Sequence, residues 1–313
     1  MKKRQIGKSS LYTAPLAFGG NVFGWTIDEK QSFKLLDEFV GEGYNLIDTA
    51  DVYARWAGKG GESETIIGRW LTARNNRDKV IIATKAGMDM GEGPGLKKNY
   101  IIKAIERSLQ RLQTGHVDLY QSHKDDAGTA VEETLEAYDI LIKTGKVRYI
   151  GASNFSAERL TQSLAASAEK NIPRYECLQP HYNLCERSIF EKELEGLCRK
   201  ENLGVIPYYS LAAGFLTGKY RNETDSSKSV RGKGALKYLN ARGLRILAAL
   251  DEISGKHNCT QAAVSIAWLL ANPVVTAPIA SATTVEQLRE LMAGATLELS
   301  EQEKKSLDAA SAI

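Results

Sequence analysis

The sequence lacks the features that mark a secreted, membrane-spanning or nucleic-acid-binding chain. No apolar run approaches the roughly 20 residues that span a bilayer. The basic start, Met1 to Arg4, leads into a polar stretch and not into an apolar one, so a signal peptide is not expected. Lys and Arg number 41 against 38 Asp and Glu, a formal net charge of +3. So small an excess indicates neither nucleic acid nor an anionic membrane as a partner.

Cysteines are few, and they are not arranged as disulfide or redox motifs. The chain has four cysteines and no C-x-x-C pair. They are Cys177, Cys185, Cys198 and Cys259. A chain of 313 residues can bury a core large enough to fold without covalent staples. We therefore expect reduced thiols in a cytoplasmic protein.

Metal-ligand and nucleotide-binding motifs are also missing. The histidines at 116, 123, 181 and 257 show no close ligand pairing, which argues against a metal-dependent hydrolase. We expect no metal. There is no complete G-x-G-x-x-G or Walker lysine loop, and the glycine-containing stretches 91–95 and 214–219 are only near misses. Neither stretch supports nucleotide binding on its own.

What the chain does contain is a regular alternation of short apolar runs with helical stripes. The apolar runs predict strands at 14–18, 44–47, 80–84, 117–122, 147–152, 176–179, 205–208 and 274–279. Helices are expected between them, one of them with Ser156 as N-cap. Eight β/α units imply a parallel sheet closed into a barrel. We predict a (β/α)8 TIM barrel of the α/β class, one domain over 1–313, with an N-terminal β-hairpin at 4–12 and extra C-terminal helices, one at 301–311.

One polar segment does not fit this count. Residues 221–236 are almost free of apolar side chains. This composition suits a mobile loop on the active-site face of a barrel. A disordered surface excursion is the alternative, and the sequence leaves both open.

Three consecutive predicted strands each deliver a polar residue at the carboxyl end. The second leads into Asp48 and, five residues later, Tyr53; the third ends on Lys85 and the fourth on His123. Barrel enzymes carry their active sites at this end. A phenol has an ordinary pKa of about 10, which a nearby ammonium lowers. We predict that Lys85 lowers the pKa of Tyr53, that Asp48 holds Lys85, and that His123 positions a carbonyl or joins the proton relay.

Each of these four residues also has an ordinary structural explanation. Asp48 could cap a loop, with Lys85 as its ion-pair partner. Tyr53 could be a buried aromatic, and His123 a core histidine bonded to a backbone carbonyl. Taken singly these explanations are favoured, because single-residue signals are weak. The joint placement of the four residues at three strand ends favours an active site, because the structural alternative needs four independent explanations.

Five ordered segments resemble the aldo-keto reductase family over nearly the whole chain. They are Asp48-Thr49-Ala50 with Tyr53, Gly61, Glu62, Ser63, Glu64 and Gly68; Thr84-Lys85-Ala86-Gly87; Asp118-Leu119-Tyr120-Gln121 with His123; Gly151-Ala152-Ser153-Asn154-Phe155; and Tyr208-Tyr209-Ser210-Leu211. The branch it resembles holds bacterial members and potassium-channel β-subunits. The resemblance implies a barrel that binds NADP(H) in extended form without a Rossmann domain. It also implies a small-molecule carbonyl substrate, Tyr53 as general acid, and a monomer or homo-oligomer.

The resemblance further implies a set of cofactor contacts. On the nicotinamide side these are Ser153, Asn154 and Gln179 for the carboxamide, and Tyr209 for stacking on the ring. Along the pyrophosphate they are Ser210, Leu211, Gly214 and Lys219, with Gly20 and Asn21 as further cofactor candidates. At the adenosine phosphate they are Ser281, Gln287 and Glu290. An ordinary turn at 153–154 and a strand-end cap at 179–180 are the alternatives.

The adenosine-phosphate segment 281–291 departs from the family pattern. Ser281 replaces the usual glycine, Thr283 or Thr284 stands where arginine is expected, and Leu291 replaces asparagine. Arg289 is expected to be a solvated helix charge. Because arginine is the usual means of binding a 2′-phosphate bidentately, NADP(H) and NAD(H) both stay open as the cofactor.

The substrate side is expected to be open. Little chain follows the last predicted helix, so we expect no tail over the substrate and a pocket that accepts varied aldehydes and ketones. Trp25, Trp56 and Lys124 are candidate wall residues. The leading function is a carbonyl reductase. The alternative is a nucleotide-binding regulatory or sensing subunit with little turnover.

Overall fold

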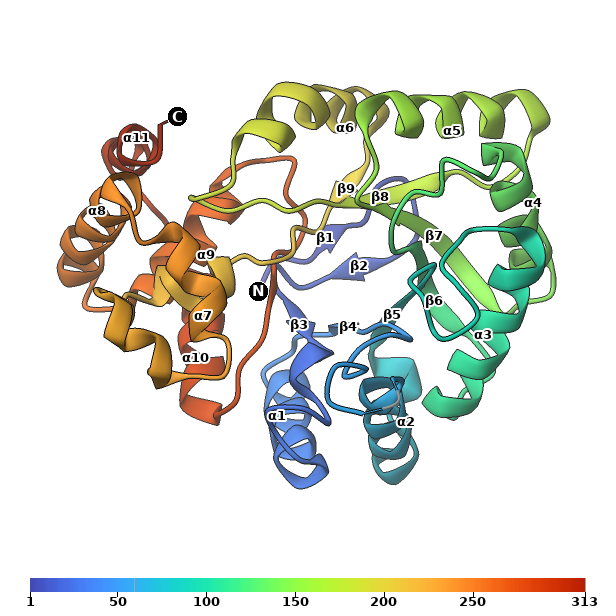
Figure 1. Cartoon of the computed structure of the whole chain (residues 1–313), viewed down its shortest axis with the longest axis horizontal. Coiled ribbons are helices and arrows are strands. Elements are labelled where there is room, and N and C mark those ends of the chain that lie inside the picture. Colours follow the sequence, from blue (N-terminus) through green and yellow to red (C-terminus); the bar gives the residue numbers. More distant parts are fainter. Residues whose placement is uncertain (59, 313) are drawn as a thin grey trace.

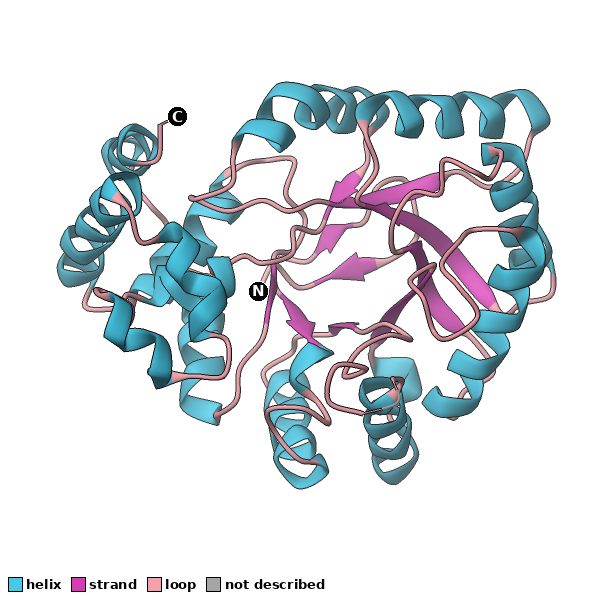
Figure 2. Ribbon diagram, in the orientation of Figure 1, coloured by secondary structure: helices cyan, strands magenta, loops and turns pink. Residues whose placement is uncertain are grey.

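Eight parallel strands form the centre of the fold. The computed structural model describes residues 1–58 and 60–312. The strands run in the order β10-β3-β4-β5-β6-β7-β8-β9. They are β3 (Ala17–Gly19), β4 (Leu46–Asp48), β5 (Ile81–Ala86), β6 (Val117–Ser122), β7 (Val147–Ser153), β8 (Tyr175–Gln179), β9 (Gly204–Val205) and β10 (Ile279–Ala280). Figures 1 and 2 show them as a curved wall with helices outside it, which confirms the predicted (β/α)8 fold.

The ring closes through sparse contacts between its last two strands. Val205 of β9 forms a parallel bridge with Val275, and the Ile279 N–H donates to the Pro207 carbonyl at 2.9 Å. Both strands are shorter than the predicted 205–208 and 274–279. Pro207 and Pro278 account for this, because proline has no N–H to give to a strand ladder.

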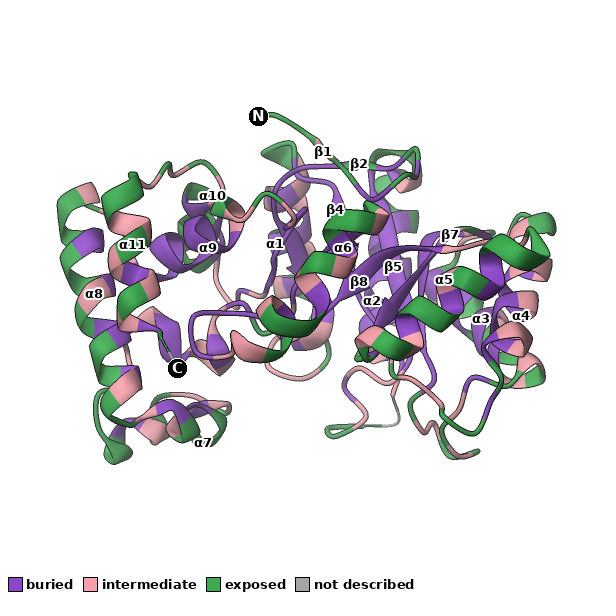
Figure 3. Cartoon of the chain, turned by 90° about the horizontal axis from the view of Figure 1, so that it is seen from above, coloured by how far each residue is buried: buried purple, intermediate pink, exposed green. Residues whose placement is uncertain are grey.

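Helices cover the outside of the wall. They are α1 (Glu29–Gly41), α2 (Glu62–Arg74), α3 (Lys98–Leu112), α4 (Val131–Lys143), α5 (Ala157–Lys170), α6 (Glu195–Glu201) and α10 (Val285–Gly294). The predicted N-cap Ser156 is confirmed, since its side chain accepts from the Arg159 N–H at 3.1 Å. Figure 3 shows the strands buried and the outer faces of α5 and α6 exposed. None of the helices in the described part of the chain has the length and apolarity to cross a bilayer.

The chain between β9 and β10 holds more helix than the sequence indicated. Within 221–236, predicted as a mobile loop, the structure has a helical turn at Glu223–Lys228 and the short helix α7 (Gly232–Ala235). A reciprocal cap between Asn222 and Asp225 starts the first of them. Two helices that the sequence analysis did not assign follow, α8 (Ala241–His257) and α9 (Gln261–Ala271). The predicted polar helix is present as α11 (Glu301–Ala310), packed against α8 (Figure 1).

Alternation along the strands builds an apolar layer inside the barrel. Residues two apart on a strand point to the same face. The apolar layer contains Leu46, Ile81, Ala83, Leu119 and Cys177. The predicted hairpin is present as β1 (Arg4–Gln5) and β2 (Tyr12–Thr13), and its Ile6 and Leu11 pack against this layer.

A polar layer follows two residues further along the same strands. Its members are Asp48 on β4, Lys85 on β5, Gln121 on β6 and Gln179 on β8, all of them buried. The same alternation that places Leu46 and Ala83 in the core therefore turns these four polar side chains inward, at the carboxyl ends of the strands. This is the end at which barrel enzymes carry their chemistry.

Candidate active site

The ammonium group of Lys85 is the centre of the polar layer. The side chain is fully buried. Its Nζ donates to Asp48 Oδ2 at 2.7 Å, to the Thr49 carbonyl at 2.8 Å and to Tyr53 Oη at 3.0 Å. An ammonium has three donors, so all of them are used. Burial lowers the pKa of Lys85, and the Asp48 carboxylate opposes this shift.

Two glutamines fix the orientation of the Asp48 carboxylate. Its Oδ1 accepts from Gln179 Nε2 at 3.0 Å and from Gln121 Nε2 at 3.4 Å. Gln179 Nε2 also donates to Gln121 Oε1 at 3.2 Å. Gln179, a predicted cofactor contact, thus uses its amide nitrogen on Asp48. The sequence analysis missed Gln121, although its place two residues after the core residue Leu119 was an available signal.

The Tyr53 hydroxyl lies between the ammonium and the carboxylate. It accepts from Lys85 and donates to Asp48 Oδ2 at 3.3 Å. Burial raises the pKa of Tyr53 well above its ordinary value of 10, and Asp48 raises it further. The net shift of this pKa is opposite to the lowering predicted from Lys85, because burial and the Asp48 carboxylate are its largest causes. The phenol is protonated at neutral pH, which is the form that can give up a proton.

His123 lies beside the Tyr53 ring, and its imidazole is uncharged. Its centroid lies 6.0 Å from that of Tyr53, in an edge arrangement. Burial, with Lys85 adding to it, lowers the pKa of His123 to about 3. Its Nδ1 is buried without a hydrogen-bond partner among residues 1–58 and 60–312. A neutral imidazole can donate one N–H to a carbonyl oxygen but cannot act as a strong acid.

Ser153 and Asn154 are brought next to this site at the end of β7. Ser153 Oγ donates to the Gln179 carbonyl at 2.9 Å. Asn154 Nδ2 donates to the His123 carbonyl at 2.9 Å, and its Oδ1 accepts from the Tyr208 hydroxyl at 2.8 Å. Both predicted cofactor contacts therefore also hold the surrounding loops together.

Tyr209 presents a half-exposed aromatic face beside His181 and Tyr208. It is 53% exposed and has a left-handed backbone, with φ of 55°. Its ring lies 5.3 Å from His181 and 5.5 Å from Tyr208. These two neighbours support the ring while leaving half of its surface open to a ligand.

The turn after Tyr209 carries the predicted pyrophosphate contacts. Ser210 is buried and donates to the Pro207 carbonyl at 3.2 Å. Leu211 precedes a helical turn, Ala212–Thr217, in which Gly214 has φ of 91°. A Cβ at Gly214 would lie 3.7 Å from Lys219 Nζ, so the lysine side chain folds back onto the turn. No carboxylate in the described part of the chain pairs with that ammonium, which lies over the Tyr220 ring.

Gly20 follows directly after β3. At this point the backbone passes close to the segment that follows β4. A Cβ there would stand 2.9 Å from Ser63 Oγ and 3.1 Å from the Asp48 carbonyl. The Gly20 carbonyl accepts from Ser63 Oγ at 2.8 Å. Gly20, a predicted cofactor contact, is thus needed as glycine because a side chain there would crowd Ser63 and the Asp48 carbonyl.

Arg231 joins this region, and the sequence analysis missed it. In its hydrogen-bonded orientation, the Asn21 amide donates to Ser281 Oγ at 2.6 Å and accepts from Arg231 at 2.9 Å. The guanidinium also lies over the Trp25 ring, 5.4 Å from its centroid. Burial lowers the pKa of Arg231, and no carboxylate pairs with it within residues 1–58 and 60–312. The only sequence signal was an arginine in an otherwise weakly patterned polar segment.

The start of α10 holds the predicted adenosine-phosphate residues. Thr284 is the N-cap of the helix. Gln287 Oε1 accepts from both the N–H and the hydroxyl of Thr283 at 3.0 Å. Gln287 and Glu290 are exposed. Arg289 is exposed as well and pairs with Glu38 at 2.7 Å, as expected for a solvated helix charge.

Two of the three predicted wall residues pack against each other, and one of them, Trp56, lies beside Tyr53. Trp25 and Trp56 meet edge to face at 5.3 Å, and Trp56 lies 6.3 Å from the Tyr53 ring. Trp56 is 54% exposed, so much of its surface is open beside Tyr53. Lys124 is exposed and makes no hydrogen bond or ion pair with any described residue.

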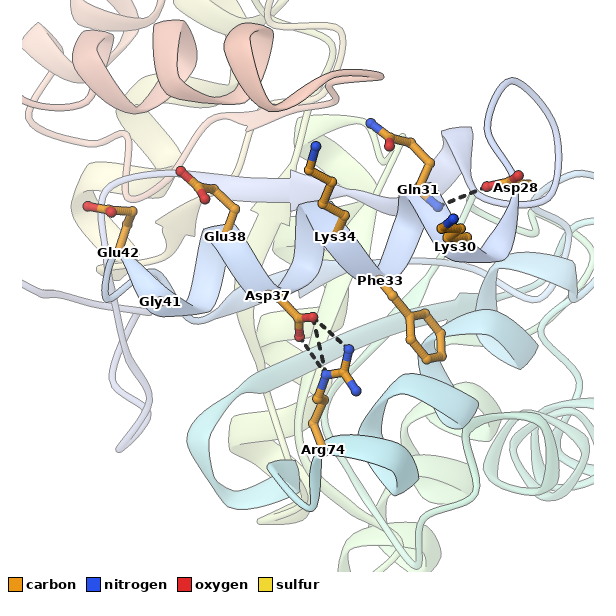
Figure 4. Close-up of a pocket in the computed structure, with 10 residues that line it drawn as sticks. All are labelled: Asp28, Lys30, Gln31, Phe33, Lys34, Asp37, Glu38, Gly41, Glu42 and Arg74. Carbon is orange, nitrogen blue, oxygen red and sulfur yellow. Dashed lines mark hydrogen bonds and ion pairs between the residues drawn. The ribbon is translucent and has the colours of Figure 1, made fainter.

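A surface hollow of about 1010 Å³ lies away from these residues, along the outer face of α1. Figure 4 shows its mostly charged lining, with Asp37 meeting Arg74 of α2 at 2.8 Å. None of Asp48, Tyr53, Lys85 and His123 lines it. The candidate site is therefore the polar layer of the barrel and not this hollow. Within residues 1–58 and 60–312, no three His, Cys, Asp or Glu side chains form a metal-binding group.

The fold and the buried constellation define an enzyme-type barrel, with polar groups gathered at its carboxyl-terminal face. The Aldo/keto reductase family matches residues 15–312. An uncharacterized oxidoreductase of Bacillus subtilis, YrpG, is 34% identical over 310 residues, which cover 96% of this chain and 93% of that protein. A probable voltage-gated potassium channel subunit beta of Arabidopsis thaliana is 32% identical, covering 93% and 90%. The protein tas of Escherichia coli is also 32% identical, covering 99% and 97%. The chain belongs to the aldo/keto reductase family of oxidoreductases.

Proposed function

We propose that this oxidoreductase reduces aldehydes and ketones to alcohols with a nicotinamide cofactor, and that Tyr53 is its general acid. The observation that carries the proposal is a single hydroxyl between a buried ammonium and a carboxylate. Tyr53 Oη lies 3.0 Å from Lys85 Nζ and 3.3 Å from Asp48 Oδ2. The family match over 15–312 supports one domain. The four free cysteines support a cytoplasmic location.

The chain's own residues provide the proton and the binding of the carbonyl. The substrate oxygen accepts from the Tyr53 hydroxyl and from a neutral His123 N–H. As that oxygen gains negative charge, Tyr53 gives it the phenolic proton. Lys85 then stabilises the phenolate through the hydrogen bond it already makes, and Asp48 keeps Lys85 charged. The same groups run in reverse when an alcohol is oxidised.

The surroundings of the site fit a nicotinamide dinucleotide, which supplies the hydride when bound. Tyr209 offers an aromatic face that is 53% exposed. Arg231 and Lys219 are cations without a carboxylate partner in the described chain, as phosphate groups require. We propose that Tyr209 stacks on the nicotinamide and that the two cations bind phosphates. Ser153, Asn154 and Gln179 are our candidates for the carboxamide, and Ser281, Gln287 and Glu290 for the adenosine end.

Arg231→Met is expected to weaken NADPH binding by about 10- to 100-fold, as loss of a charge-assisted hydrogen bond of about 1.5–3 kcal/mol implies. Titration of the protein with NADPH and with NADH, followed by tryptophan fluorescence, measures this. Arg289→Met is the matched control, because that side chain is exposed and paired with Glu38. A loss confined to NADPH would identify Arg231 as the reader of the 2′-phosphate. Unchanged NADPH binding in Arg231→Met would contradict the assignment.

A second candidate is a nucleotide-binding regulatory or sensing subunit with little turnover. The observation that favours it is the likeness to a probable potassium channel subunit beta. A chain that keeps its nucleotide through purification and reduces no aldehyde or ketone would support this function over the first.

A further inference from the structure

Two ion pairs balance the buried charges behind Tyr53. The first is Asp48 with Lys85, at 2.7 Å. The second is Glu64 of α2 with Arg111 of α3, also at 2.7 Å. Glu64 is fully buried and accepts from the Thr84 hydroxyl at 2.5 Å, one residue before Lys85. Two acids and two bases thus leave no net charge in this part of the interior.

Asp51 is a fifth ionisable group here, and it has no cation of its own. It is 2% exposed, and its N–H donates to the Lys85 carbonyl at 3.1 Å. Its Oδ1 has no hydrogen-bond partner in residues 1–58 and 60–312, and no Lys or Arg nitrogen of that part lies within 4 Å of its carboxyl group. The Val52 N–H is the backbone donor that favours the ionised carboxylate, but an ionised Asp51 would still be a charge without an ion-pair partner in the interior, which is costly.

The groups around Asp51 come from several elements. They are Lys85 on β5, Glu64 on α2, Tyr120 on β6, Tyr138 on α4, Glu92 in the loop after β5, and Tyr100, Lys103, Arg107 and Arg111 on α3. Glu92 is paired with Arg107 at 2.5 Å. Burial, with Glu64 adding to it, raises the pKa of Asp51 to about 8, and Arg111, the Val52 N–H and Lys85 oppose this shift.

A small pocket connects Asp51 with the outside of the barrel. Its volume is about 80 Å³, and Met90, Glu92, Tyr100 and α3 side chains line it together with Asp51. Arg107 and Lys103 at this pocket are exposed. Protons can therefore reach Asp51 between α3 and the loop after β5, on a route separate from the open face of Tyr53.

We propose that Asp51 is a positioning residue for the proposed carbonyl reduction and that it is uncharged in the working enzyme. When Asp51 loses its proton to solvent, its negative charge acts through Lys85 and slows the reduction. The ionised carboxylate places a third negative charge beside Lys85. That charge opposes the formation of phenolate on Tyr53, so the phenol becomes a poorer acid. Asp51 itself touches neither substrate nor cofactor. The inference rests on the proposed function of the site.

Asp51→Asn keeps the shape of the uncharged side chain and cannot ionise. We expect its kcat for aldehyde reduction at pH 7 to lie within about two-fold of wild type, by analogy with exchanges that remove no charge. In wild type kcat falls as pH rises through about 8, and in Asp51→Asn this fall is absent or moved to higher pH. Asp78→Asn, a change at an exposed acid, is the control and keeps the wild-type profile.

Carbon-13 NMR of aspartate carboxyl carbons tests the ionisation on the unmutated chain. We expect one carboxyl signal to titrate near pH 8 and to be missing from Asp51→Asn. The absence of any carboxyl that titrates above pH 6 in wild type would overturn the proposal, whether or not the variant folds. Wild-type turnover with superimposable pH profiles for Asp51→Asn would overturn the positioning role alone. No turnover in wild type at any pH would overturn the proposed function and this role together.

Discussion

Tyr53→Phe is expected to lower kcat for carbonyl reduction by about 10²- to 10⁴-fold, the usual contribution of a general acid. The substitution removes the proton that the substrate oxygen needs, and it keeps the ring that contacts His123 and Trp56. NADPH affinity is expected to stay within about two-fold of wild type, since the change removes no charge. Steady-state reduction of an aldehyde and fluorescence titration with NADPH measure the two quantities.

Tyr12→Phe is the matched control for this experiment. Tyr12 is 52% exposed on the N-terminal hairpin, so loss of its hydroxyl is expected to change neither quantity. A Tyr53→Phe variant with wild-type kcat would exclude Tyr53 as the acid. A variant that loses nucleotide binding as well would show a structural role for the hydroxyl.

Lys85→Met is expected to abolish measurable turnover and to lower the free energy of unfolding by about 3–5 kcal/mol. It leaves the Asp48 carboxylate buried without a cation, and Tyr53 without the donor that stabilises its phenolate. Urea unfolding and aldehyde reduction measure the two effects.

The double variant Lys85→Met with Asp48→Asn separates stability from catalysis. Removing both charges is expected to restore much of the stability, because no unpaired charge remains in the core. Activity is expected to stay lost, because no ammonium stands beside Tyr53. Recovery of activity together with stability would mean that the Asp48–Lys85 pair is only structural.

The sequence was enough to predict why Asp48, Lys85 and His123 meet. Strand residues alternate faces, and three neighbouring parallel strands end on the same side of the barrel. The contact of Lys85 with Asp48 then follows from strand order and alternation, whereas the position of Tyr53 depends on the loop after β4. The shortened last strands were harder to predict, because Pro207 and Pro278 remove ladder donors without interrupting the apolar pattern.

Arg231 and Asp51 show what local patterns leave out. Arg231 reaches Asn21 only because the 221–236 segment folds back over the end of β3, a tertiary contact about 210 residues apart in the chain. Asp51 looks like an ordinary loop acid in the sequence. Only the structure shows that the nearby cations Lys85 and Arg111 are already paired with Asp48 and Glu64. The direction of the Tyr53 pKa shift was wrong for a similar reason, since a sequence shows the nearby ammonium but not the cost of burial.

A single-turnover experiment tests the central claim most directly. The protein is mixed with one equivalent of NADPH and then, in a stopped-flow instrument, with an excess of an aldehyde such as methylglyoxal. We predict that the nicotinamide absorbance of the bound NADPH is lost in full, with one alcohol formed per nucleotide, and that Tyr53→Phe slows this step. Bound NADPH whose absorbance does not change in wild type would contradict the account and favour a nucleotide-binding subunit without turnover.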